Sequence, residues 1–73
     1  LTHEGAATLA RSGLLSLNIS NNSIGDLGAT ALANSRLKTL IASNCDIGNA
    51  GSASLSANKT LEKLDLSENE NIT

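Results

Sequence analysis

Large apolar residues recur along the chain at long, nearly constant intervals. Leu14, Leu37 and Leu61 head three copies of one pattern, and the steps between them are 23 and 24 residues. Just after each of these leucines apolar and polar residues alternate, as they do around Leu17 and Ile19 in the first copy. A two-residue period predicts a strand with one buried face. Each copy of the repeat therefore begins with a short strand.

The second half of each copy predicts a helix. In the segment from Gly28 to Ala33, apolar residues at 29, 32 and 33 have the spacing of one helix face. We expect Asp26 to cap this helix at its N-terminus and the small residues to let it lie close behind the strands. In the next copy Ser52 and Ser56 replace two of these alanines, so that each hydroxyl needs a hydrogen bond there. That helix is expected to be the weakest.

The repeats divide the whole chain without a separate linker. We expect the tail of one repeat at 1–13, complete repeats at 14–36 and 37–60, and the start of another at 61–73, as a fragment of a longer array. Strands that alternate with helices predict a right-handed α/β solenoid, with parallel strands on its concave face and helices on its convex face. The repeat at 37–60 carries one extra residue between its helix and the next strand.

A polar column follows the strands, formed by Asn22, Cys45 and Asn69. The backbone turns at this point and leaves amide and carbonyl groups without strand partners. Buried asparagine side chains both donate and accept hydrogen bonds, so we expect these residues to form a structural ladder, one rung per repeat. The thiol of Cys45 tolerates burial but bonds weakly, which favours a structural role over a reactive one.

Composition narrows the possible functions. The chain of 73 residues contains no aromatic residue, no methionine and one cysteine, so the core must be aliphatic and no disulfide can form within it. A net charge of -2 with five Lys and Arg residues gives no footprint for nucleic acid. No apolar run approaches the length of a membrane span. We therefore expect neither nucleic acid nor a membrane as a partner.

Residues with catalytic or ligand-binding chemistry are few. His3 has no partner at a recognisable spacing and is expected to be solvated in the loop before the first helix. The acidic residues Glu62, Asp65, Glu68 and Glu70 lack the spacing of a calcium loop and are interpreted as a solvated face. No set of residues indicates an enzyme, a metal site or a cofactor.

The predicted surface is more informative than the chemistry. Stacking the repeats places polar side chains in three rows on the open strand face, which we expect to bind a protein partner. These rows are Ser16, Thr39 and Lys63; Asn18, Ile41 and Asp65; and Ser20, Ser43 and Ser67, bordered by Asn21, Asn44 and Glu68. The face lacks the aromatic and Arg residues that often anchor tight interfaces. It would therefore supply a modest part of a larger binding surface.

These columns resemble the leucine-rich repeats, and among them the ribonuclease-inhibitor-like type with a helix on the convex side. The signature positions are Leu14, Leu17, Ile19, Asn22 and Ile24, followed by Leu37, Leu40, Ala42, Cys45 and Ile47. The segments Gly5 to Ala10 and Gly28 to Ala33 are similar to the GALA-type repeats of bacterial effector proteins. That resemblance implies a substrate adaptor for a host ubiquitin ligase, although these residues contain no F-box.

Two other functions remain open from the sequence. The repeats could act as a structural spacer or adaptor arm of a larger effector or ubiquitin-ligase-recruiting protein. Copies of the chain could instead associate through repeat ends that lack capping segments. The compartment implied is the cytoplasm or, for an effector-like protein, a host cell into which the protein is secreted.

Overall fold

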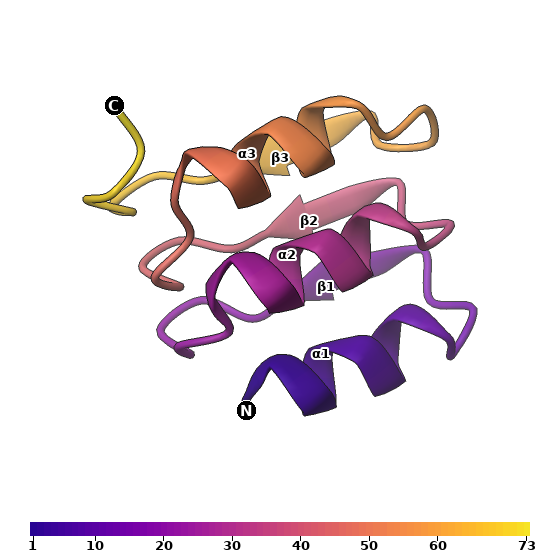
Figure 1. Ribbon diagram of the computed structural model, residues 1–73. Helices are drawn as coiled ribbons and strands as arrows, with labels where there is room; N and C mark the ends of the chain where they lie inside the picture. The colour runs from indigo at the N-terminus through magenta and orange to yellow at the C-terminus, as the bar shows by residue number, and fades with distance from the viewer.

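Helices and short strands alternate along the whole chain. The computed structural model describes residues 1–73. It has three helices and three strands, which are labelled in Figure 1. In chain order these are α1 (His3–Ala10), β1 (Ser16–Asn18), α2 (Gly25–Ala33), β2 (Thr39–Ile41), α3 (Asn49–Ser56) and β3 (Lys63–Asp65). The predicted succession of strand and helix in every repeat is confirmed.

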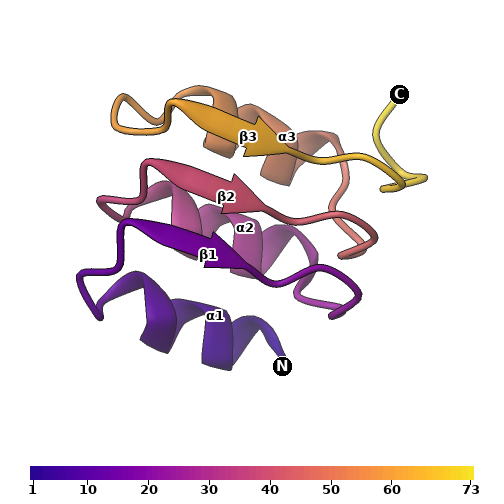
Figure 2. The same ribbon diagram turned by 180° about the vertical axis from the view of Figure 1, so that it is seen from behind.

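The three strands form one open, parallel sheet in the order β1-β2-β3. Leu40 at the centre of β2 lies opposite Leu17 on one side and Leu64 on the other. In Figure 2 the strands all run in the same direction, and consecutive strands are neighbours. Each step along the sheet is therefore one repeat.

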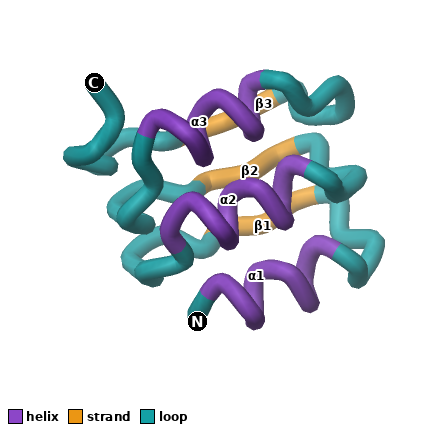
Figure 3. Tube along the Cα trace, in the orientation of Figure 1, coloured by secondary structure: helices purple, strands orange, loops and turns teal.

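The helices form a second layer on one face of the sheet only (Figures 1 and 3). Helix α2 packs between α1 and α3 in this layer. A strand that returns through a helix to the next parallel strand gives the stacked architecture predicted from the sequence. The chain is a short α/β solenoid, and the opposite face of its sheet has no covering layer.

The core lies between the two layers and is aliphatic apart from Cys45. Its fully enclosed large side chains come from both layers, with Leu40 from the strands and Leu32 and Leu55 from the helices. Burial falls toward the first repeat, where Leu14 is 39% exposed although Leu37 in the same column is 2% exposed. A repeat position is thus buried only where a neighbouring repeat packs against it.

Small residues set the distance between α2 and α3. A Cβ atom added to Gly51 would lie 2.8 Å from the Cβ of Ala29 and 2.9 Å from Cγ2 of Ile47. Both distances are shorter than ordinary contacts between carbon atoms, which lie near 3.5–4.0 Å. Gly51 therefore allows the two helices to approach each other.

Asp26 caps a different helix from the one predicted. Helix α2 begins without any side-chain cap, and the Asp26 carboxylate instead reaches the start of α3 in the next repeat. Its Oδ1 accepts hydrogen bonds from the backbone N–H of Gly48 at 2.7 Å and of Gly51 at 2.9 Å. The prediction was wrong because adjacent helices lie close enough for a first-turn side chain to reach its neighbour. Capping here links one repeat to the following one.

Replacing Asp26 with alanine should destabilise the protein by about 1–2 kcal/mol, since two N–H groups at the start of α3 lose their acceptor. Asp26→Asn keeps an oxygen at the same place and should retain most of this contribution. Urea unfolding followed by circular dichroism measures both variants. Equal stability of the alanine and asparagine variants would contradict a capping role for this side chain.

Two smaller expectations also differ from the structure. Ser56 is exposed rather than packed on the inner face of α3, and Ser52 is half-buried. The helix-internal hydroxyl bond comes from Ser54, whose Oγ donates to the carbonyl of Ala50 at 3.2 Å. His3 is exposed as expected, but it begins α1 rather than lying in the preceding loop.

Candidate binding face

The open face of the sheet carries the predicted side chains in register. Ser16, Thr39 and Lys63 lie opposite one another across the three strands. The next outward-facing row is formed in the same way by Asn18, Ile41 and Asp65. No helix covers this side of the sheet (Figure 2). The face is thus a regular array of polar side chains around one isoleucine.

Hydrogen bonds join the three serines just after the strands. The Ser20 hydroxyl oxygen accepts from the backbone N–H of Ser43 at 3.2 Å, and the Ser67 hydroxyl donates to that of Ser43, also at 3.2 Å. These three residues come from different repeats yet form one continuous row. Their hydroxyl groups present a polar strip along one side of the face.

Two polar side chains in the middle row bond locally. Oδ1 of Asn18 accepts from the backbone N–H of Ser20 at 3.1 Å, and Oδ1 of Asp65 accepts from that of Ser67 at 2.9 Å. Ile41 has no such acceptor and is half-buried between them. The flanking side chains are therefore held in place, and the centre of the face is apolar.

The hydrogen bond from the Ser67 backbone N–H lowers the pKa of Asp65, and the Ser67 hydroxyl and the charge of Lys63 act in the same direction. A lowered pKa means that the folded state binds this proton less readily than the unfolded state. Ionised Asp65 thus stabilises the fold above its ordinary pKa of about 3.9, and this contribution is lost as the pH falls through the lower folded value.

Asp65→Asn should therefore lower the urea midpoint at pH 7, and the difference from the unmodified protein should shrink as the pH falls below about 3.9. Urea titrations at pH 7 and at pH 3 measure this difference. Glu70→Gln, which alters another exposed carboxylate near the same end of the chain, is the control. A difference that stays constant with pH would contradict the stabilising role of the ionised carboxylate.

Asn69 is buried in the polar column that follows the strands, and its side chain forms hydrogen bonds with two repeats. Its Oδ1 accepts from the backbone N–H of Cys45 at 2.8 Å and of Ile47 at 3.0 Å. Its Nδ2 donates to the carbonyls of Ala42 at 2.9 Å and Leu66 at 2.8 Å. One side chain thus satisfies the turn of the preceding repeat as well as its own.

The other two members of the column bond less extensively. Cys45 is buried, and its thiol donates to the carbonyl of Ile19 at 3.2 Å. Nδ2 of Asn22 donates to the same carbonyl at 2.9 Å, and its Oδ1 accepts from the terminal amine of Leu1 at 3.3 Å. A thiol is a weak acceptor. The backbone N–H of Ile24 instead bonds locally, to the carbonyl of Asn22 at 2.8 Å.

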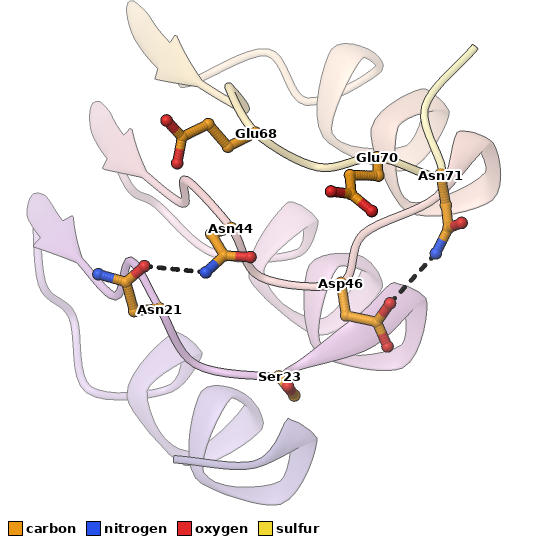
Figure 4. Close-up of a pocket in the computed structure, with 7 residues that line it drawn as sticks. All are labelled: Asn21, Ser23, Asn44, Asp46, Glu68, Glu70 and Asn71. Carbon is orange, nitrogen blue, oxygen red and sulfur yellow. Dashed lines mark hydrogen bonds between the residues drawn. The ribbon is translucent and has the colours of Figure 1, made fainter.

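A shallow polar cavity of about 310 Å³ lies beyond the strand ends, beside the face. Figure 4 shows its lining residues, which are Asn21, Ser23, Asn44, Asp46, Glu68, Glu70 and Asn71. Asn44 donates to Asn21 at 3.0 Å, and Asn71 donates to Asp46 at 3.2 Å. No hydrophobic residue lines this cavity. The border residues expected from the sequence, Asn21, Asn44 and Glu68, therefore belong to a larger polar surface.

Asn58 is a structural residue that the sequence interpretation overlooked. Its Nδ2 donates to the carbonyl of Ala33 at 2.6 Å, and its Oδ1 accepts from the backbone N–H of Thr60 at 2.7 Å and of Leu61 at 2.8 Å. It lies in the loop that contains the extra residue of the repeat at 37–60. This loop is one residue longer than its counterpart in the preceding repeat. That difference in length could have indicated that a side chain such as Asn58 stabilises the loop.

A family model described as leucine-rich repeat matches residues 14–33 and 57–73. The matched segments cover more than half of the chain, which belongs to the leucine-rich repeat family. Proteins with these repeats generally bind other proteins, and the repeats are typically binding modules rather than enzymes. Comparison with curated proteins gives no match. None of the three helices has the length and apolar character needed to cross a membrane.

Proposed function

We propose that the protein binds a protein partner through the open face of its sheet. The observation that carries this proposal is the uncovered array of side chains on three parallel strands, held in register around Ile41. A regular array of this kind can contact a partner at several positions at once. Membership of a family that generally binds proteins supports the same function.

The shape expected of a repeat array favours this face. Parallel strands are more closely spaced than the helices behind them, so a longer array curves with its strands on the inside. The apolar Ile41 is surrounded by polar neighbours, as in the apolar centre and polar rim of many interfaces. The presence of helices rather than extended segments behind the sheet supports the ribonuclease-inhibitor-like type for these repeats.

Substitution of two side chains on the face tests the proposal. Ile41→Arg together with Asp65→Arg places two bulky cations on the face and changes the net charge by three units. Glu4→Arg together with Ala53→Arg makes the same charge change at exposed helical positions and serves as the control. Circular dichroism should show that both double variants retain the fold.

Each form of the protein is then used to capture partners, which are quantified by mass spectrometry. We expect the Ile41 and Asp65 variant to capture at least tenfold less of a specific partner that the helix-side control retains. A loss of about 1.4 kcal/mol in binding free energy already lowers the affinity tenfold. Equal recovery by the two variants, with both correctly folded, would place the binding site elsewhere.

Association between copies is a second candidate function, favoured by the partial exposure of apolar side chains at the two ends of the stack. Leu14 is 39% exposed at one end, and Leu61, Leu64 and Ile72 are half-buried at the other. Stacking of one copy on another would cover these residues. Sedimentation of the 73-residue chain at several concentrations tests this association, and a mass that stays at one chain throughout argues against it.

A further inference from the structure

Basic and acidic side chains lie mostly at opposite ends of the strands. Because the strands are parallel, the loops that enter them lie along one edge of the sheet, and the loops that leave them lie along the opposite edge (Figure 2). We call these the entry edge and the exit edge. All the cationic side chains lie at the entry edge, namely Arg11, Arg36, Lys38, Lys59 and Lys63. Five of the seven acidic side chains lie at the exit edge, namely Glu4, Asp26, Asp46, Glu68 and Glu70. Of the other two, Asp65 ends β3, and Glu62 lies at the entry edge beside Lys63, so that edge keeps a net positive charge.

Helix dipoles explain only part of this separation. Negative side chains are stabilised in the first turn of a helix and positive ones in the last turn. Glu4 and Asp26 do lie in first turns, but no helix has a basic residue in its last turn. Asp46, Glu68 and Glu70 lie outside the helices altogether. The charges at the two ends of the open face therefore have no evident role in starting or ending a helix.

The charged groups nearest the open face are accessible to a partner. Lys63 begins β3 in the first row of the face, and Lys38 immediately precedes β2; both are exposed. At the other end of the strands, Asp46, Glu68 and Glu70 are exposed and line the polar cavity shown in Figure 4. A segment lying along the strands would thus meet cations at one end and carboxylates at the other.

We propose that the partner contributes a segment with opposite charges at its two ends, and that this segment lies along the strands with its basic end at the exit edge. Its acidic end would meet Lys38 and Lys63 at the entry edge. This inference rests on the proposed function of the open face and adds the chemistry and direction of the bound segment. The reversed orientation would bring like charges together at both edges, which costs binding free energy.

The separation of the two edges makes them partly distinct sites of recognition. The principal extents of the molecule are 29 × 22 × 16 Å, all longer than the screening length of about 8 Å at physiological ionic strength. Charges at opposite edges are therefore partly screened from each other, and each end of the partner segment responds more strongly to the charges beside it than to those at the other edge. Two separate charge contacts fix the direction of an extended segment more strictly than one contact can.

A pair of synthetic peptides tests the orientation. One peptide has three Glu at its N-terminus, three Lys at its C-terminus and a Gly-Ser linker between them. The other peptide has the same composition, but its Glu and Lys residues alternate. Nuclear magnetic resonance titrations of the labelled protein measure binding. We expect tighter binding of the charge-separated peptide, and a nitroxide at its Lys end should broaden the amide signals of Asn44 and Glu68. A nitroxide at its Glu end should instead broaden those of Thr39 and Glu62.

A matched pair of neutralised variants adds a quantitative check. Glu68→Gln with Glu70→Gln should weaken binding of the charge-separated peptide by about fivefold, as expected for the loss of two exposed charge contacts. Glu4→Gln with Glu62→Gln removes the same net charge from the helix layer and from the entry edge, outside the polar cavity, and should not weaken it. Equal affinity for the two peptides, or broadening at the opposite edges, overturns the inference.

These outcomes separate the two proposals. The proposed function fails if the Ile41 and Asp65 double variant retains its partner. The charge inference alone fails if that variant loses its partner, while the two peptides bind with equal affinity or the charge-separated peptide binds in no fixed direction.

Discussion

Replacing Asn69 with leucine should lower the free energy of unfolding by about 3–4 kcal/mol. The substitution leaves the backbone N–H groups of Cys45 and Ile47 without their acceptor in the interior, and each unsatisfied buried donor costs about 1–3 kcal/mol. Leucine fills a similar volume, so the loss reflects hydrogen bonding more than packing. A domain of this size has a total stability of only about 4–11 kcal/mol, so the variant should be close to unfolding.

Asn22→Leu provides a control at the same position of an earlier repeat. Asn22 is half-buried, and its oxygen accepts only from the exposed terminal amine of Leu1. Its replacement should cost about 1–2 kcal/mol, mainly through loss of the bonds from its Nδ2 to two carbonyls. Urea unfolding compares the two variants. A cost for Asn69→Leu no larger than for Asn22→Leu would show that the bonds to the preceding repeat contribute little.

Gly51→Ala should destabilise the protein by about 1–3 kcal/mol, although alanine is the better helix former. Alanine gains about 1 kcal/mol in helix propensity at such a position. Its Cβ would, however, lie 2.6 Å from Oδ1 of Asp26 and 2.8 Å from the Cβ of Ala29. Relieving these contacts moves α2 from α3 at a packing cost of about 1–3 kcal/mol. Displacing the Asp26 cap costs about 1 kcal/mol more.

The same substitution at Gly5 should have the opposite sign. Gly5 holds the equivalent position in α1, where an added Cβ meets the side chain of Leu1. That side chain is 48% exposed and can rotate away, so Gly5→Ala should gain about 0.5–1 kcal/mol. Thermal unfolding of the two variants measures the difference. Stabilisation of similar size at both positions would mean that α2 and α3 can separate without cost.

The repeat period made the fold predictable from the sequence. A constant step places equivalent residues side by side in parallel strands, so aligning Leu17, Leu40 and Leu64 gave the strand register as well as the helix layer. The same alignment placed the side chains of the open face in their rows. Their role in binding is a separate question, and it stays a prediction until the variants above are measured.

Contacts between repeats were harder to predict. The alignment identifies Asp26 as a first-turn residue, which favours a cap on its own helix, but it carries no information on the spacing and stagger of α2 and α3. Asn58 was missed for a related reason, since its bond to Ala33 depends on how its loop lies over the C-terminal end of α2. The alignment predicts which residues of the repeats are equivalent. Which side chain contacts a neighbouring repeat depends on distances in three dimensions that the alignment does not contain.

The bonds between repeats run in both directions, and this constrains how such an array can change length in evolution. Asp26 serves the helix of the following repeat, and Asn69 serves the turn of the preceding one. A deletion or duplication that keeps whole repeats leaves the backbone groups of adjacent repeats in the same relative positions, whereas one that ends within a repeat does not. Single-residue insertions are tolerated at the entry edge, where Asn58 supports the longer loop. A second extra residue lies between Asn69 and Ile72, where the other repeats have only two steps from the polar column to the isoleucine. Indels should therefore accumulate in the loops that connect strands and helices and be rare within those elements.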